Sequence, residues 1–117
     1  MRKFRHVYVE MYKRKVYFAK CSRKQFAKML KVELGLEAHQ ISEYNVATTE
    51  KYTAENRTMK WPIYVIWITD WRYLAHEIFH CVHWILNDVN MRLSDDSEEA
   101  YAYLTEYLDN QLRKGIK

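Results

Sequence analysis

The six-residue apolar run IYVIWI, residues 63–68, constrains the fold of this chain more than any other feature. Four of the six residues are β-branched, Pro62 precedes the run and Asp70 follows it closely. The run is too short for an ordinary helix, and β-branched side chains favour strands. When one face of a strand meets water, polar and apolar residues alternate along it. This run shows no such alternation. The run therefore predicts a strand that is buried on both faces.

Two helices are predicted after this strand, because apolar residues recur at helical spacing. The first runs from about Trp71 to Asn87, capped by Asp70, and its apolar side comprises Leu74, Ile78, Cys81, Val82 and Ile85. A polar loop over 87–96 follows. The second helix is capped by Ser94 or Asp95 and ends near Leu112. Its apolar stripe comprises Ala100, Tyr101, Leu104, Tyr107, Leu108 and Leu112.

The first half of the chain predicts a small sheet and one helix. We expect strands over 4–12 and 16–21, a helix over 23–34, and one or two irregular strands within 37–60. Ser22 is suited to cap the helix, and Gly35 is suited to end it. The order of elements predicts a single α+β domain over residues 1–117, with a small sheet packed by about three helices.

Composition supports one domain that stays inside the cell. Hydrophobic residues make up 49% of the chain, with only two glycines and one proline, so long linkers are not expected. No apolar run reaches membrane-spanning length, and the N-terminus lacks the apolar centre of a signal peptide. Two cysteines, Cys21 and Cys81, are too few for a disulfide framework. We therefore expect a cytoplasmic protein with reduced thiols.

Charge is uneven along the chain. Residues 1–31 hold eleven Lys or Arg and one acid, a net of +10, whereas the remaining residues carry a net of −6. The basic segment could contact nucleic acid or an acidic partner, with Tyr8, Tyr12 and Tyr17 available for base stacking. Its basic residues are interleaved with apolar ones, which favours the alternative that they form the solvated face of strands and a helix.

The sequence His76-Glu77-Ile78-Phe79-His80 carries the strongest chemical signal. Histidines at i and i+4 lie on one helical face about 6 Å apart, so both imidazoles can bind one metal ion. A carboxylate directly after the first histidine flanks such an ion and can take a proton from metal-bound water. The pattern therefore predicts a zinc site, with two exposed histidines and no metal as the alternative.

A catalytic zinc needs a third protein ligand and one open position. His83 lies on the same helical face as His76, but three ligands on one straight helix close poorly into a tetrahedron. His83 is better interpreted as a packed histidine or as one that supports a metal ligand without binding the ion itself. Glu98 and Glu99 begin the last helix, and a loop lets that helix fold back on the first. Periodicity alone does not choose between these two carboxylates.

Taken together, His76-Glu77-x-x-His80, the preceding Ile66-Trp67-Ile68 and the following Glu99-Ala100-x-Ala102-Tyr103-Leu104 resemble the small gluzincin-type metallopeptidase-like proteins encoded by bacteriophages. The resemblance covers roughly residues 61–110. It implies a minimal zincin-like core, Zn²⁺, Glu99 as the third ligand, a peptide or protein substrate and a location in the host cytoplasm. In zincins the strand before the metal helix often lies at the edge of the cleft, whereas the apolar run 63–68 predicts burial.

The residues predict a zinc-dependent hydrolase, and the resemblance implies that it is a metallopeptidase. Zinc is held by His76, His80 and Glu99, and Glu77 is the general base. Tyr103 is a candidate to stabilise the oxyanion, as are His83 and Tyr52. The alternative is a non-catalytic phage-encoded modulator that keeps the fold and works by contact, with nucleic acid or an acidic partner at its basic N-terminal third.

Overall fold

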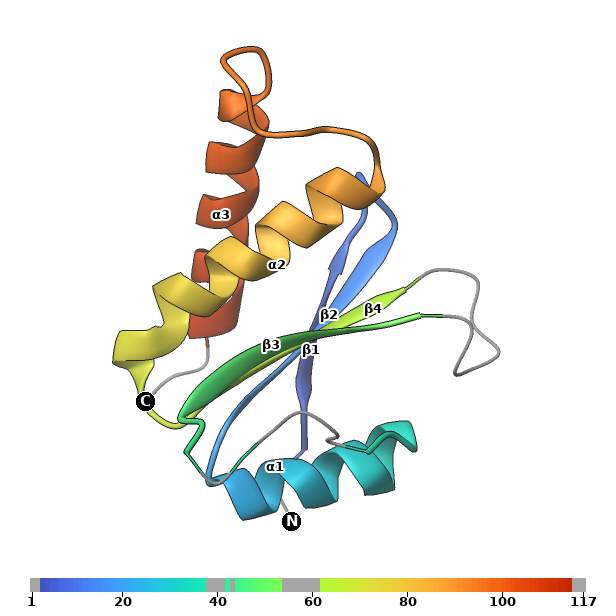
Figure 1. Ribbon diagram of the computed structural model, residues 1–117, viewed down its shortest axis with the longest axis vertical. Helices are drawn as coiled ribbons and strands as arrows, with labels where there is room; N and C mark the ends of the chain where they lie inside the picture. Colours follow the sequence, from blue (N-terminus) through green and yellow to red (C-terminus); the bar gives the residue numbers. More distant parts are fainter. Residues whose placement is uncertain (1–2, 38–41, 43, 54–61, 115–117) are drawn as a thin grey trace.

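A mixed sheet in the order β1-β2-β4-β3 forms the centre of the structure (Figure 1). The computed structural model describes residues 3–37, 42, 44–53 and 62–114. Within them the strands are β1 (Arg5–Val9), β2 (Arg14–Lys20), β3 (Ala47–Tyr52) and β4 (Ile63–Ile68). The β2–β4 pair is parallel, and the other two pairs are antiparallel. With the helices described below, this confirms the predicted α+β class.

Strand β4 is a central strand with the predicted bounds. It pairs with β2 on one side and with β3 on the other, and residues 64–68 are completely buried. Its side chains alternate between two cores. Tyr64, Ile66 and Ile68 belong to the core under α2 and α3, whereas Val65 and Trp67 belong to the core under α1. The prediction of burial on both faces is confirmed, and β3, not β4, lies at the edge of the sheet.

One face of the sheet is covered by α1 (Arg23–Met29), which continues as the π-helical turn η1 (Leu30–Leu34). Ser22 caps α1 as predicted, because its hydroxyl accepts the Gln25 N–H while the Gln25 side chain accepts the Ser22 N–H. Gly35 ends η1 at a φ of 65°, the left-handed conformation that glycine adopts without strain. The Phe26 ring stacks on Trp67 with 5.1 Å between centroids.

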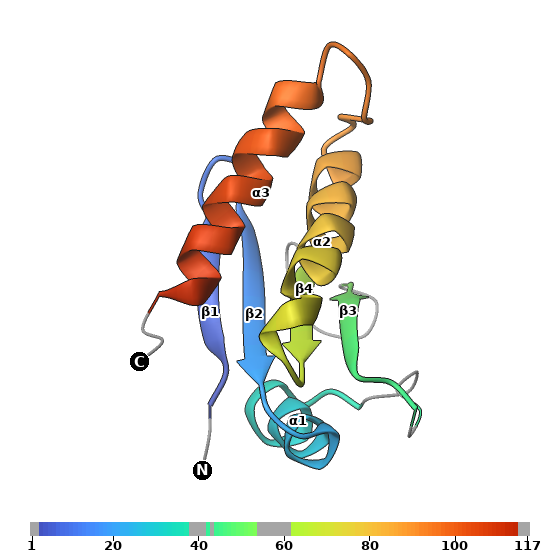
Figure 2. The same cartoon turned by 90° about the vertical axis from the view of Figure 1, so that its left-hand side faces the viewer.

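The other face is covered by α2 (Leu74–Asp88) and α3 (Glu98–Arg113), which lie side by side (Figure 2). The apolar residues predicted for the first of these helices are all buried, and Leu86 joins them. Asp70 accepts a hydrogen bond from the Arg72 N–H at 2.9 Å, and so caps the 3₁₀ turn η3 (Trp71–Tyr73) that leads into α2.

The predicted start of the last helix is wrong by a few residues. Neither Ser94 nor Asp95 caps it, because the loop forms its own turn. The Ser94 N–H donates to the Ser97 hydroxyl at 3.0 Å, and that hydroxyl donates to the Arg92 carbonyl. The helix begins only after this turn, at Glu98.

The N-terminal hairpin is shorter than predicted at its first strand. The chain turns after Val9, where the Tyr12 N–H donates to the Val9 carbonyl at 3.2 Å and Lys13 adopts a φ of 55°. β2 then begins at Arg14. The expected irregular strands of 37–60 are one regular strand, β3, in the described part; residues 38–41, 43 and 54–61 lie outside it.

Two further expectations concern the environment of the chain. In the ranges that the structure describes, we find no helix with the length and apolar character needed to cross a membrane. Cys21 and Cys81 are both buried, and neither forms a disulfide bond within the described residues.

Candidate metal centre

The first half of α2 presents His76 and His80 on its exposed face. Their Nε2 atoms lie 3.1 Å apart, and the ring centroids are 4.7 Å apart. Two nitrogens bound to one tetrahedral zinc at 2.0–2.1 Å would be about 3.3 Å apart. The i, i+4 spacing of the helix has therefore brought the two imidazoles close to the separation needed to share a metal ion.

Glu77 turns away from this exposed face, towards the sheet. Its side chain is buried at 6% exposure, and its Oε1 lies 2.7 Å from the hydroxyl of Thr49 on the edge strand β3. The same hydroxyl lies 2.9 Å from the Glu77 carbonyl oxygen. A threonine hydroxyl has one proton and donates to one of these oxygens at a time. Thr49 thus fixes the Glu77 carboxylate against β3.

Nothing in the sequence pointed to Thr49. The contact joins residues 28 positions apart, so it depends on how α2 packs on the sheet. Strand alternation places Thr49 and Lys51 on the α2 side of β3. It places Tyr52 in the core under α1. Tyr52 therefore lies on the opposite face of the sheet from the histidine pair, which removes it as an oxyanion candidate.

His83 sits one turn beyond His80 among packed neighbours. Its ring stacks against Phe79 at 6.1 Å between centroids, and the Asn87 amide lies 3.0 Å from its Nδ1. The Tyr101 ring of α3 is 6.3 Å away. His83 is nevertheless exposed, so the role of a packed histidine that the sequence favours stays a prediction. Phe79, which is 51% exposed, forms an aromatic border beside His80.

Glu98 and Glu99 both lie exposed in the first turn of α3. That turn sits beside the later half of α2, because Tyr101 contacts His83 and donates to the Met91 carbonyl at 2.9 Å. In the described ranges no three His, Cys, Asp or Glu side chains converge on a common point. The structure therefore brings His76 and His80 together but does not bring Glu99 to them, and the third ligand stays a prediction.

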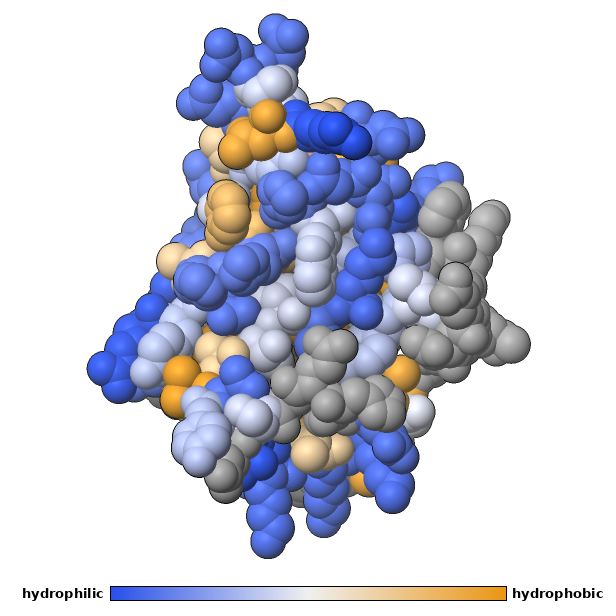
Figure 3. All heavy atoms as spheres, in the orientation of Figure 1, coloured by the Kyte–Doolittle hydropathy of each residue, from blue (hydrophilic) through white to orange (hydrophobic). Residues whose placement is uncertain are grey.

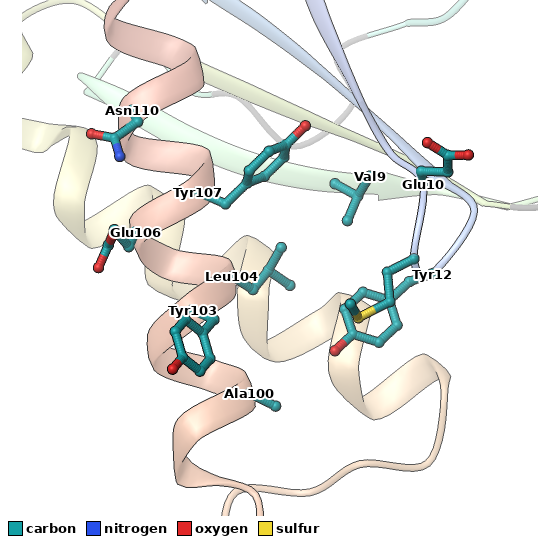
Figure 4. A pocket seen from close by; sticks show the side chains of 10 residues that line it. Val9, Glu10, Tyr12, Ala100, Tyr103, Leu104, Glu106, Tyr107 and Asn110 are labelled. Carbon is teal, nitrogen blue, oxygen red and sulfur yellow. The ribbon is translucent and has the colours of Figure 1, made fainter.

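Tyr103 occupies a groove between α3 and the β1–β2 turn (Figure 4). It is 69% exposed. Tyr12, Leu104 and Tyr107 line the same groove, whose walls are mainly apolar. This surface contains neither His76 nor His80. The role of Tyr103 in stabilising an oxyanion stays a prediction.

A polar cluster anchors the far end of α2 to the sheet. Asp88 accepts a hydrogen bond from the Tyr64 hydroxyl and pairs with Lys51, whose Nζ lies 2.7 Å from Oδ1. Burial raises the pKa of Tyr64 above its usual range, and the hydrogen bond to Asp88 adds to the rise. The phenol stays protonated and can donate. With Thr49 holding the first turn of α2 and Asp88 holding the last, the helix is fixed on the sheet at both ends.

Comparisons of the chain with protein-family models, with curated proteins and with solved structures find no match.

Proposed function

We propose that the protein is a metal-dependent hydrolase in which His76 and His80 bind a zinc ion and Glu77 is the general base. The observation that carries the proposal is the exposed imidazole pair with Nε2 atoms 3.1 Å apart. Glu77 follows His76 directly in the chain, and Thr49 holds its carboxylate. Two imidazoles suit zinc, although other divalent ions accept the same ligands. The zincin-like interpretation of the sheet and helices belongs to this proposal.

Each residue has a distinct task. His76 and His80 would hold the ion through their Nε2 atoms. A zinc ion held there would supply water activation, because it would lower the pKa of a water molecule towards about 7. Thr49 engages Oε1 of Glu77. For the Glu77 carboxylate to act as the base, its side chain would have to turn from β3 towards the ion, where it would take a proton from water and later pass it to the leaving group.

The resemblance to gluzincin-type proteins supplies the remaining parts of the proposal. It assigns Glu99 as the third ligand and peptide bonds as the substrate class. For Glu99 to bind the same ion as His80, the first turn of α3 has to move along α2 from its position beside His83. Exchange of Glu99 for Gln should then weaken zinc binding, and the matched exchange Glu98→Gln should not.

Elemental analysis of the purified protein tests the metal. We expect one zinc per chain in the native protein, and loss of zinc in His80→Ala. His83→Ala is the matched control, because it removes a histidine of the same exposed helix face and should keep the metal. A native protein without metal, or equal metal in the two variants, would overturn the site.

Hydrolysis of unfolded casein, with and without a chelator, tests the chemistry. Glu77→Gln should keep zinc but lose turnover, since the amide cannot accept the proton. Turnover at the native rate in this variant would refute the base assignment. Zinc binding without any hydrolysis in the native protein would favour the alternative, a protein that keeps the metal and acts by contact.

A further inference from the structure

The hairpin of β1 and β2 carries a partly open surface on the α1 side of the sheet. Phe4 and Ala19 are buried there beneath α1. Further along the hairpin, the same face carries two cross-strand pairs, His6 with Tyr17 and Tyr8 with Lys15. His6 and Tyr8 are exposed, Tyr8 by 49%, whereas Lys15 and Tyr17 are half-buried. We call these four residues the hairpin platform.

The platform combines aromatic rings with a cation. The His6 and Tyr17 rings lie 6.0 Å apart between centroids, and the Lys15 Nζ lies 5.8 Å from the centre of the Tyr17 ring. Tyr17 is also held from below, because the Phe4 ring packs edge-on against it at 5.9 Å. The rings are therefore positioned by packing while part of their surface faces solvent.

The first third of the chain, which contains the platform, is strongly basic in sequence. Glu10 is the one acid among residues 1–31, against eleven Lys or Arg. The neighbouring α1 and η1 expose Arg23, Lys24, Lys28 and Lys31. Glu33 contributes one negative charge to this side, where its carboxylate accepts the Phe4 N–H at 3.1 and 3.2 Å. Figure 3 shows hydrophilic side chains interspersed with hydrophobic ones at the lower end of the molecule, where Figure 1 places α1.

The structure also separates the tyrosines of the hairpin. Tyr12 follows the turn at Val9, packs against the core under α2 and α3, and lines the groove with Tyr103. Of Tyr8, Tyr12 and Tyr17, only Tyr8 and Tyr17 belong to the hairpin platform. The platform lies on the opposite side of the sheet from α2, so it is independent of the proposed metal site.

We propose that the hairpin platform binds single-stranded nucleic acid. Unpaired bases can stack on the exposed rings of Tyr8 and His6, while Lys15 and the surrounding basic residues neutralise phosphates. The exposed aromatic rings favour single-stranded nucleic acid over a duplex or an acidic peptide. A duplex keeps its bases stacked on one another, and an acidic peptide would use the positive charge but not the aromatic surface.

Fluorescence anisotropy with labelled oligo(dT) of about 12 nucleotides tests the proposal. Tyr8→Ala should weaken binding at least about fivefold, because it removes one stacking surface. Tyr8→Phe keeps the ring and should keep the affinity. Tyr107→Ala is the matched control, since it removes a tyrosine 41% exposed on α3, outside the platform. Affinity should fall steeply with salt, and Lys15→Ala should flatten that dependence.

Three results would overturn the proposal. The first is no binding of oligo(dT) at low salt. The second is an equal loss of affinity in Tyr8→Ala and Tyr107→Ala, with both variants shown to be folded by circular dichroism. The third is equal competition by a DNA duplex or by polyglutamate, since either would show that charge alone, without the rings, accounts for binding.

Discussion

Replacing Thr49 by Val tests how the candidate base is held. The two side chains have the same shape, so the exchange removes the hydroxyl and leaves the packing in place. Hydrogen bonds to charged groups contribute about 1.5–3 kcal/mol, and the Glu77 carboxylate at 6% exposure has little water to replace the lost partner. We expect the free energy of unfolding to fall by about 2 kcal/mol, and the melting temperature by about 8 °C.

Urea unfolding followed by tryptophan fluorescence measures this loss. Thr48→Val is the matched control, because Thr48 is the adjacent residue of β3 and points to the other face of the sheet. Valine suits a strand, so the control should be neutral or slightly more stable. In a Glu77→Gln background, Thr49→Val should cost only about 1 kcal/mol, because the acceptor is then neutral.

Equal stability of Thr49→Val and Thr48→Val would refute the reasoning, because it would show that the hydrogen bond at 2.7 Å contributes nothing to holding Glu77. An equal cost in the native and Glu77→Gln backgrounds would refute the narrower claim that the bond is strengthened by charge.

Two further predictions concern stability. Asp88→Ala should cost about 2 kcal/mol in urea unfolding because it leaves the buried Tyr64 hydroxyl without its acceptor. Lys51→Met should cost under about 1 kcal/mol because the ion pair between Lys51 and Asp88 is partly exposed. Equal costs of Asp88→Ala and Lys51→Met would contradict the claim that the Tyr64 hydroxyl depends on Asp88. Stability should fall as pH rises above 9, since burial raises the pKa of Cys81 above its ordinary 9.0 and only the unfolded thiol ionises there. Cys81→Ala should show a slope shallower by up to about 1.4 kcal/mol per pH unit; an unchanged slope would contradict this.

Features that depend on neighbouring residues could be predicted closely. The bounds of β4 match the apolar run residue for residue, and Ser22 and Gly35 enclose the first helix as their backbone preferences require. The approach of His76 and His80 also follows from local geometry, because residues four apart on a helix share a face.

The predicted ends of helices and strands are wrong where a loop makes its own hydrogen bonds. Ser94 is a good cap by residue type, but its N–H donates to Ser97 and delays the helix to Glu98. The turn after Val9 similarly ends β1 early. In both places several short-range hydrogen bonds compete, and residue type alone does not show which of them forms.

The sequence by itself determined the imidazole pair, the buried central strand and the basic first third, because each depends on composition or on spacing along one element. The tertiary structure decided the rest of the site. It placed Thr49 on Glu77, put the first turn of α3 beside His83, and grouped Tyr8 with Tyr17 while sending Tyr12 to the other face. Such contacts join residues far apart in the chain, and only the packing of helices on a twisted sheet selects among the many partners that the same residue types allow.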